Sequence, residues 1–176
     1  MEENDLINFI KPYYENKDIM HNMWHINLVK KEVDKILAIS DYDVNYNNLL
    51  YALYFHGFIY SDEKKIREFL NKHSFSYDDI ENIIKIAWES QRGEEPKTIE
   101  GKILHDAHVL EGGKTYLVVK TLITGSLRGQ NLEETLKFMK NNVLNKNKCY
   151  LKETIPLCEE MNKYTNEFYE NIINSV

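Results

Sequence analysis

The chain has 176 residues, the size of one domain with a sizeable core, and it leaves no room for a second domain. Hydrophobic residues make up 43% of it and charged residues 28%, with only three prolines, which excludes the disordered and fibrous classes of protein. The formal net charge is −6, and acidic and basic residues are interspersed, so no broad cationic face is available to bind duplex nucleic acid.

The first half of the chain predicts five helices. Apolar residues recur with a period near 3.6 and no segment alternates convincingly, so we expect an all-α fold. Ser61, followed by Asp62 and Glu63, is typical of a helix N-terminus because the acids complement the helix dipole there. The predicted helices run from Leu6 to Tyr14, from Asn22 to Ile39, from Asn45 to Phe58, from Ser61 onward, and from Tyr77 to Ser90.

Four further helices are expected in the second half. A loop from Gln91 to Lys97 holds a glycine and a proline, which break the chain. Asn131 with Glu134 three residues later resembles a capping box. The apolar stretch after the glycine pair at 112 and 113 is interpreted as helix, although Val118 and Val119 leave a strand open. The predicted helices cover Thr98 to Leu110, the stretch up to Ile123, Asn131 to Asn145, and Tyr150 to Ile173 with a bend near Pro156.

Three polar residues lie in the middle of apolar helical faces: His25, His56 and Asp106. A polar side chain on a core face must be desolvated, so it needs a hydrogen-bonding partner or a cation. Apolar residues one turn away bracket Asp106 on both sides, whereas His105 projects sideways and His108 projects toward the polar, solvated face. Each residue alone could simply be hydrogen-bonded in the core. Two imidazoles and a carboxylate from three helices together predict a site for one divalent metal ion.

The order of these residues resembles the HD superfamily of metal-dependent phosphohydrolases. The first motif is His-Asn-Met-Trp-His at 21–25, the second is Ala-Leu-Tyr-Phe-His-Gly at 52–57, and the third is Glu-Gly-Lys-Ile-Leu-His-Asp-Ala-His at 100–108. The resemblance covers about residues 18–140 and implies a single HD-like helical domain over residues 1–176. It also implies hydrolysis of a small phosphorylated metabolite, plausibly a nucleotide, by metal-activated water, with His56 and Asp106 at the catalytic centre.

Gly57 departs from the pattern because it stands where the family carries its second-motif Asp, which by resemblance is a metal ligand. The remaining set, His25, His56 and Asp106, can hold one Mn, Fe, Zn, Ni, Co or Mg ion with positions open for water. A dinuclear site is therefore not expected. Gly57 is also interpreted as a helix C-cap, a place that favours glycine, and both interpretations can hold at once.

Several side chains are candidates for binding the substrate phosphate. His21 lies one turn before His25 on the same face, and by resemblance it is assigned to the phosphate. Arg92, Lys97 and Arg128 occur in loops that contain glycine and are candidate charge partners of the phosphate. Ordinary surface exposure is the alternative for each of these four residues. The sequence identifies no general acid.

The cellular setting is inferred from three absences. Cys149 and Cys158 match no zinc-finger or redox spacing and are expected to be core thiols. No apolar run approaches the roughly 20 residues that cross a bilayer, and the acidic N-terminus is unlike a secretory signal. We therefore expect a cytoplasmic protein that contacts neither a membrane nor duplex nucleic acid. The oligomeric state stays open, a homodimer included.

Three classes of function remain after the sequence analysis. The first is the HD-type hydrolase. The second is a degenerate, catalytically inactive HD domain that senses a nucleotide or a metal, because Gly57 has replaced a ligand. The third is a purely structural helical module, in which the three polar burials are coincidental. Metal content separates the third class from the others, and turnover separates the first from the second.

Overall fold

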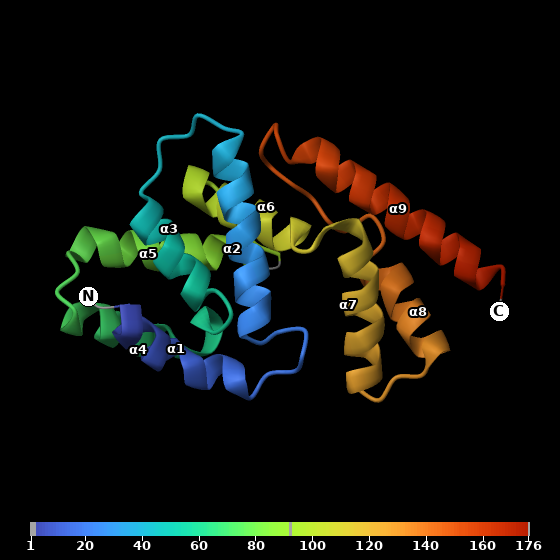
Figure 1. The fold of residues 1–176 in the computed structure, drawn as a ribbon, viewed down its shortest axis with the longest axis horizontal. Coiled ribbons are helices and arrows are strands. Elements are labelled where there is room, and N and C mark those ends of the chain that lie inside the picture. The colour runs from blue at the N-terminus through green and yellow to red at the C-terminus, as the bar shows by residue number, and fades with distance from the viewer. Residues whose placement is uncertain (1–2, 92, 176) are drawn as a thin grey trace.

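The computed structural model describes residues 3–91 and 93–175. This part of the chain contains nine helices and no strand (Figure 1). This confirms the all-α prediction. The helices are α1 (Glu3–Glu15), α2 (Met23–Ala38), α3 (Tyr46–Phe55), α4 (Ile59–Lys72), α5 (Tyr77–Glu89), α6 (Ile99–Leu110), α7 (Gly113–Leu127), α8 (Leu132–Asn142) and α9 (Ile155–Ile173).

Side-chain caps explain where most of these helices begin. Such a cap satisfies a backbone N–H that the first turn of a helix leaves without a partner. The predicted capping box is confirmed, since Asn131 accepts from the backbone of Glu134 and the Glu134 carboxylate accepts in return. The other capping side chains are Asn22 for α2, Asn45 for α3, Ser76 for α5 and Thr98 for α6.

Two predicted helix starts and one predicted ending are corrected. The fourth helix begins at Ile59, before Ser61, and Asp62 interrupts it with a non-helical φ of −131°. The last helix begins only at Ile155, so Pro156 lies in its first turn and causes no bend. A proline is tolerated there because its missing N–H would have no intrahelical acceptor anyway. The stretch that left a strand open is the helix α7, which continues beyond Ile123 to Leu127.

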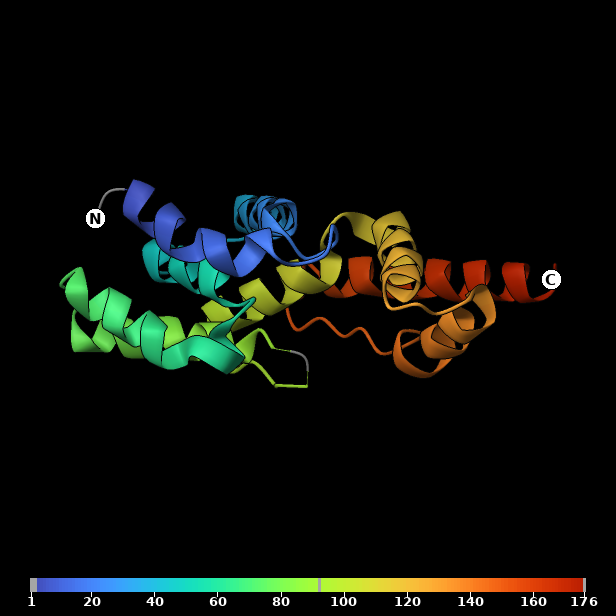
Figure 2. The same cartoon turned by 90° about the horizontal axis from the view of Figure 1, so that it is seen from below.

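The apolar core is divided unequally along the chain. Helices α1–α6 share one large buried cluster, whereas the C-terminal helices contribute two smaller ones. Figure 2 shows the corresponding elongated shape, with α1–α5 toward one end and α7–α9 toward the other. Cys149 and Cys158 are free, buried thiols in one of the smaller clusters. That the chain forms one continuous domain stays a prediction.

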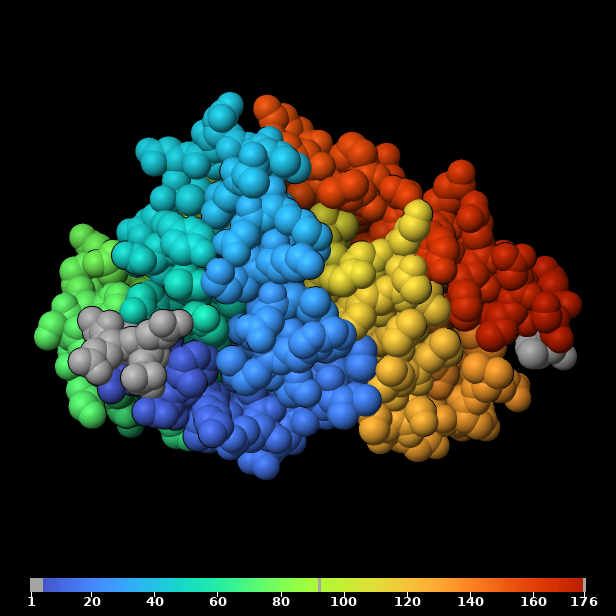
Figure 3. Space-filling model, viewed as in Figure 1, coloured from blue at the N-terminus to red at the C-terminus, as the bar shows by residue number. Residues whose placement is uncertain are grey.

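Helix α6 connects the two parts, since it packs against α2, α3 and α5 and also against α9. A second connection joins α2 to α7, where the rings of Trp24 and Tyr116 meet edge to face with centroids 5.6 Å apart. The space-filling view shows the surface formed by α2 and the chain before it lying directly against α7 (Figure 3). No helix in the described ranges is long and apolar enough to cross a membrane.

Candidate metal centre

Three histidines converge between the two parts of the molecule. His25 comes from α2, His56 follows the last turn of α3, and His108 comes from α6, and one ring nitrogen of each lies within 4.8 Å of the others. His25 and His56 are buried and His108 is partly buried. The closest pair of nitrogens is Nε2 of His25 and Nε2 of His56, 3.1 Å apart. The structure thus brings together two of the predicted ligands, with His108 beside them.

The neighbours of the first two rings determine which nitrogen carries the proton. Nδ1 of His25 donates to the carboxylate of Glu111, and Nδ1 of His56 donates to the carbonyl oxygen of Leu53 at 2.5 Å. Both Nε2 atoms are then unprotonated and direct their lone pairs toward each other across 3.1 Å. Two lone pairs repel at that distance unless a cation lies beside them. Outer hydrogen bonds of this kind are typical of metal-binding histidines.

Burial keeps the cluster neutral. Desolvation is the largest cause that lowers the pKa of each imidazole, and the other positive groups nearby add to it. For His56 the next cause is His25, and for His108 it is His56. Because a histidine binds a metal only in its neutral form, lowered pKa values favour metal binding at pH 7.

The donor set fits a first-row divalent ion. Two nitrogens bound to Zn at about 2.0–2.1 Å in a tetrahedral arrangement lie about 3.3 Å apart, close to the 3.1 Å between His25 and His56. Three imidazoles suit Zn, Fe or Ni better than Mg, which prefers oxygen ligands. His108 also lines a cavity, so water or a substrate in that cavity would have access to an ion held by the three imidazoles.

Asp106 is not part of this cluster, and its predicted roles as metal ligand and catalytic residue are corrected. Its carboxylate is fully buried and accepts from the backbone N–H groups of Tyr150 and Leu151, each at 2.9 Å, and from the hydroxyl of Thr154 at 2.5 Å. Residues two positions apart on a helix point about 200° apart, so Asp106 and His108 lie on opposite sides of α6. The prediction that His108 points to solvent is wrong, because the side of α6 away from Asp106 faces His25, His56 and the cavity.

Glu111 is a member of the site that sequence analysis missed. It directly follows α6, is 5% exposed, and its carboxylate bridges the imidazole of His25 and the ammonium of Lys120. The available signal was its spacing from His108, because residues three apart share a helix face. A buried carboxylate on the distal nitrogen of a histidine fixes the orientation of the ring and increases its basicity.

The reason for glycine at position 57 is a close approach, and the C-cap interpretation is corrected. The C-cap of α3 is His56, and the φ angle of Gly57 does not lie in the left-handed region. A Cβ atom at Gly57 would lie 2.6 Å from the hydroxyl oxygen and 2.8 Å from Cε1 of Tyr14. Tyr14 is fully buried and donates to the carbonyl oxygen of Tyr54 at 2.8 Å. The tyrosine therefore occupies space that a side chain at position 57 would need.

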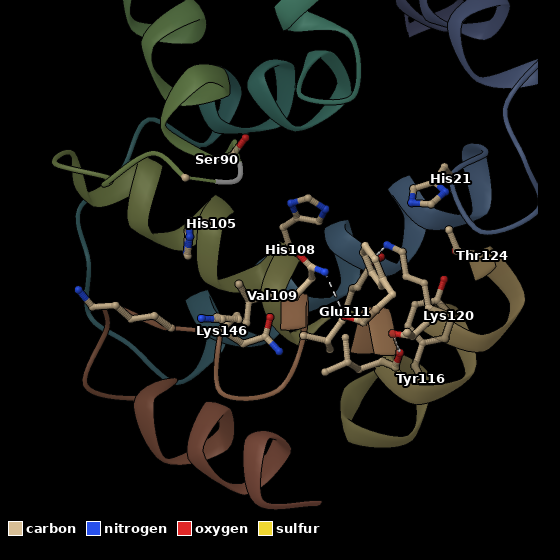
Figure 4. Close-up of a pocket in the computed structure, with 18 of the residues that line it drawn as sticks. His21, Ser90, His105, His108, Val109, Glu111, Tyr116, Lys120, Thr124 and Lys146 are labelled. Atoms are coloured by element: carbon tan, nitrogen blue, oxygen red, sulfur yellow. Dashed lines mark hydrogen bonds and ion pairs between the residues drawn. The ribbon is translucent and has the colours of Figure 1, made fainter. Parts of the chain in front are cut away.

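A cavity of about 640 Å³ opens beside the cluster, between α6, α7, α8 and the segment before α9 (Figure 4). His21 lines it and bonds through Nδ1 to the carboxylate of Asp18 at 2.8 Å. Arg128 also lines it, whereas Lys97 is exposed and does not. Arg92 lies outside the described residues. Two of the four predicted phosphate partners are thus placed at one cavity.

Comparison with known proteins supports the fold and goes no further. No model of a known protein family matches the chain, and no curated protein sequence does. Among solved structures, the chain is similar to the Lin1889 protein from Listeria innocua, with a TM-score of 0.71 and 20% sequence identity. The likeness covers 98% of this chain and 96% of that one. At this level of identity it shows a shared helical arrangement over almost the whole length.

Proposed function

We propose that the protein is a metal-dependent hydrolase of a small phosphomonoester, with His25, His56 and His108 as the metal ligands. The observation that carries the proposal is the approach of Nε2 of His25 to Nε2 of His56 at 3.1 Å, with Nδ1 of each ring bonded to another acceptor, beside a cavity that contains cationic side chains. The resemblance to the HD superfamily supplies the reaction class, and the corrected ligand set replaces the carboxylate of Asp106 by a third imidazole.

The residues have separate tasks in this proposal. A divalent ion at the three imidazoles supplies Lewis-acid activation of water and of a phosphoryl oxygen. Glu111 holds the ring of His25 in orientation and binds Lys120, whose ammonium lines the cavity. Lys120 and Arg128 would bind the negative charge of the phosphate.

The second candidate is a sensor that binds a metal or nucleotide without turnover. Gly57 and the buried ring of Tyr14 favour the sensor. The glycine supplies no carboxylate where the HD superfamily has one, and the tyrosine occupies the space that such a side chain would need. The two candidates share the metal and the cavity and differ only in turnover.

Elemental analysis of protein never exposed to a chelator tests the metal, and a phosphate-release screen with added Zn, Mn or Co tests turnover. We expect one ion per chain, and a stabilisation of about 2.7 kcal/mol when free metal is at 100 times its dissociation constant. The variant His108→Ala should lose both the ion and phosphate release. His73→Ala is the matched control, since His73 lies at the end of α4 outside the cluster.

The outcomes separate the candidates. Metal bound without phosphate release, in a screen that includes nucleoside monophosphates and sugar phosphates, favours the sensor. Protein without metal, and with no thermal shift on adding Zn, Mn or Co, contradicts the hydrolase and the metal sensor and leaves only a sensor that binds a nucleotide. Equal metal content in His108→Ala and in the wild type would contradict the ligand set.

A further inference from the structure

The two cysteines of the chain lie in contact with each other in its C-terminal region. Cys149 belongs to the irregular segment that connects α8 to α9, and Cys158 lies in the first turn of α9. Both thiols are free, and the two residues are only 6% and 3% exposed. Their side chains share a hydrogen bond within one small apolar cluster. Their spacing of nine residues matches no redox motif, so the fold alone reveals the pair.

The surroundings of the Cys158 sulfur favour its thiolate form. The thiol and the backbone N–H of Cys149 both donate to this sulfur, and Nδ2 of Asn162 lies 3.8 Å from it. The positive end of the α9 dipole is nearby as well. The hydrogen bond from the Cys149 thiol is the largest cause, and it lowers the pKa of the Cys158 thiol. Burial and the carboxylates of Asp106 and Glu159 act in the opposite direction and are outweighed.

The Cys149 thiol has the opposite character. Its hydrogen bond to Cys158 and its burial raise its pKa, so Cys158 is the first of the two to ionise. The thiolate is the nucleophilic form of cysteine. A thiol that ionises readily beside a second thiol is the usual arrangement of an oxidisable cysteine and its resolving partner.

We propose that Cys149 and Cys158 form a reversible disulfide within one chain when hydrogen peroxide oxidises the protein. The Cys158 thiolate attacks one peroxide oxygen, the O–O bond breaks, and hydroxide leaves a sulfenic acid behind. The Cys149 sulfur then attacks the sulfur of Cys158, the S–S bond forms, and the S–O bond breaks. The thiol proton and the two departing oxygens complete two water molecules, so two thiols and one peroxide give one disulfide.

Two features of the structure permit this reaction. The sulfurs are already in hydrogen-bonding contact, so an S–S bond of about 2.05 Å requires only a local movement. Residues 147–150 form no helix, and local opening of such a segment admits a small oxidant to the buried thiols. A small external dithiol reverses the reaction by thiol–disulfide exchange.

The disulfide acts on the wall of the cavity beside the histidine cluster. Tyr150 directly follows Cys149, and its ring packs edge to face against His105 with centroids 5.0 Å apart. Tyr150 and His105 both line the cavity. Bond formation draws Cys149 toward α9 and so moves Tyr150 relative to His105. This inference goes beyond the proposed function and requires neither metal nor turnover.

The test exposes the full chain to hydrogen peroxide after chelation, which prevents oxidation catalysed by metal. We expect both thiols to be lost without dimer formation, and the intact mass to fall by two hydrogens. Peptide mapping should find Cys149 joined to Cys158, and dithiothreitol should restore both thiols. A disulfide restricts the unfolded chain, so the melting temperature of the oxidised monomer should be higher by about 5 °C or more.

Single variants test which thiol reacts first. Cys149→Ser retains the thiol that ionises readily and should form a sulfenic acid that dimedone labels. Cys158→Ser retains the other thiol, and its labelling should be at least tenfold slower. The same two variants in urea are the matched control, because unfolding removes the contacts that distinguish the thiols and should make the two rates similar.

Nuclear magnetic resonance tests the effect on the cavity. The ring signals of His105 should shift when the disulfide forms, whereas those of His73 at the end of α4 should not. Unchanged His105 signals in the oxidised monomer would overturn the link between the thiols and the cavity.

The other outcomes are also decisive. Retention of both thiols in the folded wild type, at a peroxide concentration that oxidises them in urea, overturns the inference. Disulfide-linked dimers without the internal bond overturn it as well. Equal labelling rates of the two folded variants overturn the assignment of Cys158 as the attacking thiol. An internal disulfide in a protein that binds no metal and releases no phosphate supports the inference while contradicting the proposed function.

Discussion

The hydrogen bonding of buried polar groups differs between helices α1–α6 and helices α7–α9. In the first region, buried polar side chains such as Asn48, Glu89 and Asp106 all have hydrogen-bond partners. In the second, the four unpartnered atoms found in the described residues lie between Tyr116 and Asn162. The comparison indicates that the first region is a scaffold that holds His25 and His56, whereas the second is packed with less complete hydrogen bonding.

Helix α6 belongs to both regions, and its two faces have different tasks. On one face, the carboxylate of Asp106 binds the chain just before α9 and so fixes the C-terminal region to the scaffold. On the other face, His108 joins the histidine cluster and lines the cavity. Stability and chemistry are therefore separable by substitutions two residues apart on α6, and the first of three predictions tests that separation.

The largest expected effect is that of Asp106→Ala on stability. The change leaves the backbone N–H groups of Tyr150 and Leu151 buried without an acceptor, which costs about 1–3 kcal/mol for each group, whereas the hydroxyl of Thr154 can still donate to the carbonyl oxygen of Leu151. We expect the free energy of unfolding, measured by urea denaturation, to fall by at least about 3 kcal/mol. The folded fraction should still bind metal, because Asp106 is not in the cluster.

Thr154→Val is the graded control for this prediction. It removes the hydroxyl but preserves both backbone donors, so it should cost about 1–2 kcal/mol. A loss of less than about 1 kcal/mol in Asp106→Ala would contradict the anchoring role. Loss of metal from folded Asp106→Ala would restore Asp106 as a candidate ligand.

These two faces also show what the sequence could and could not predict. The burial of His25, His56 and Asp106 was predictable because each lies among apolar residues on its own helix. The structural role of Asp106 could not be predicted, because its partners are backbone N–H groups about 44 residues away in the chain, and a backbone group carries no sequence signal. His108 was missed because a helix projection describes one helix, whereas the cavity that His108 faces is formed by several.

The second prediction concerns Gly57→Asp, the change that would restore the residue of the HD motif. A side chain there meets the ring of Tyr14 at 2.6–2.8 Å, and a fully buried ring cannot move without disturbing the core. We expect a loss of about 1–3 kcal/mol in the free energy of unfolding, without tighter metal binding. Gly57→Ala should show a loss of similar size, because the Cβ atom alone makes the contact.

A double-mutant cycle with Tyr14→Leu identifies the cause. The smaller side chain should recover part of the stability that Gly57→Ala loses, giving a coupling of about 0.5–3 kcal/mol between the two changes. Additive losses would show that the tyrosine is not the obstacle. If Gly57→Asp tightens metal binding at least tenfold, the carboxylate reaches the site in spite of Tyr14, and the ligand set must be extended.

The smallest expected effect is the contribution of each histidine of the cluster to the pH dependence of the free energy of unfolding. Burial lowers the pKa of His25 to about 2 and that of His56 to about 3, and it lowers that of His108 as well. In the unfolded chain each histidine has a pKa near 6.5, so below that pH the unfolded state binds more protons than the folded state. Stability should therefore be constant above about pH 6.5 and should fall as the pH decreases toward the folded pKa values.

The measurement is urea denaturation of chelated protein at pH 7.5 and at pH 5.5, where carboxylates are still ionised. Each buried histidine should contribute about 1.4 kcal/mol to the loss of stability between these two values. The variant His108→Gln should therefore lose about 1.4 kcal/mol less than the wild type. Equal stability of the wild type at both pH values would mean that the histidines gain protons in the folded state, and a cluster that accepts protons so readily would not be poised to hold a metal ion.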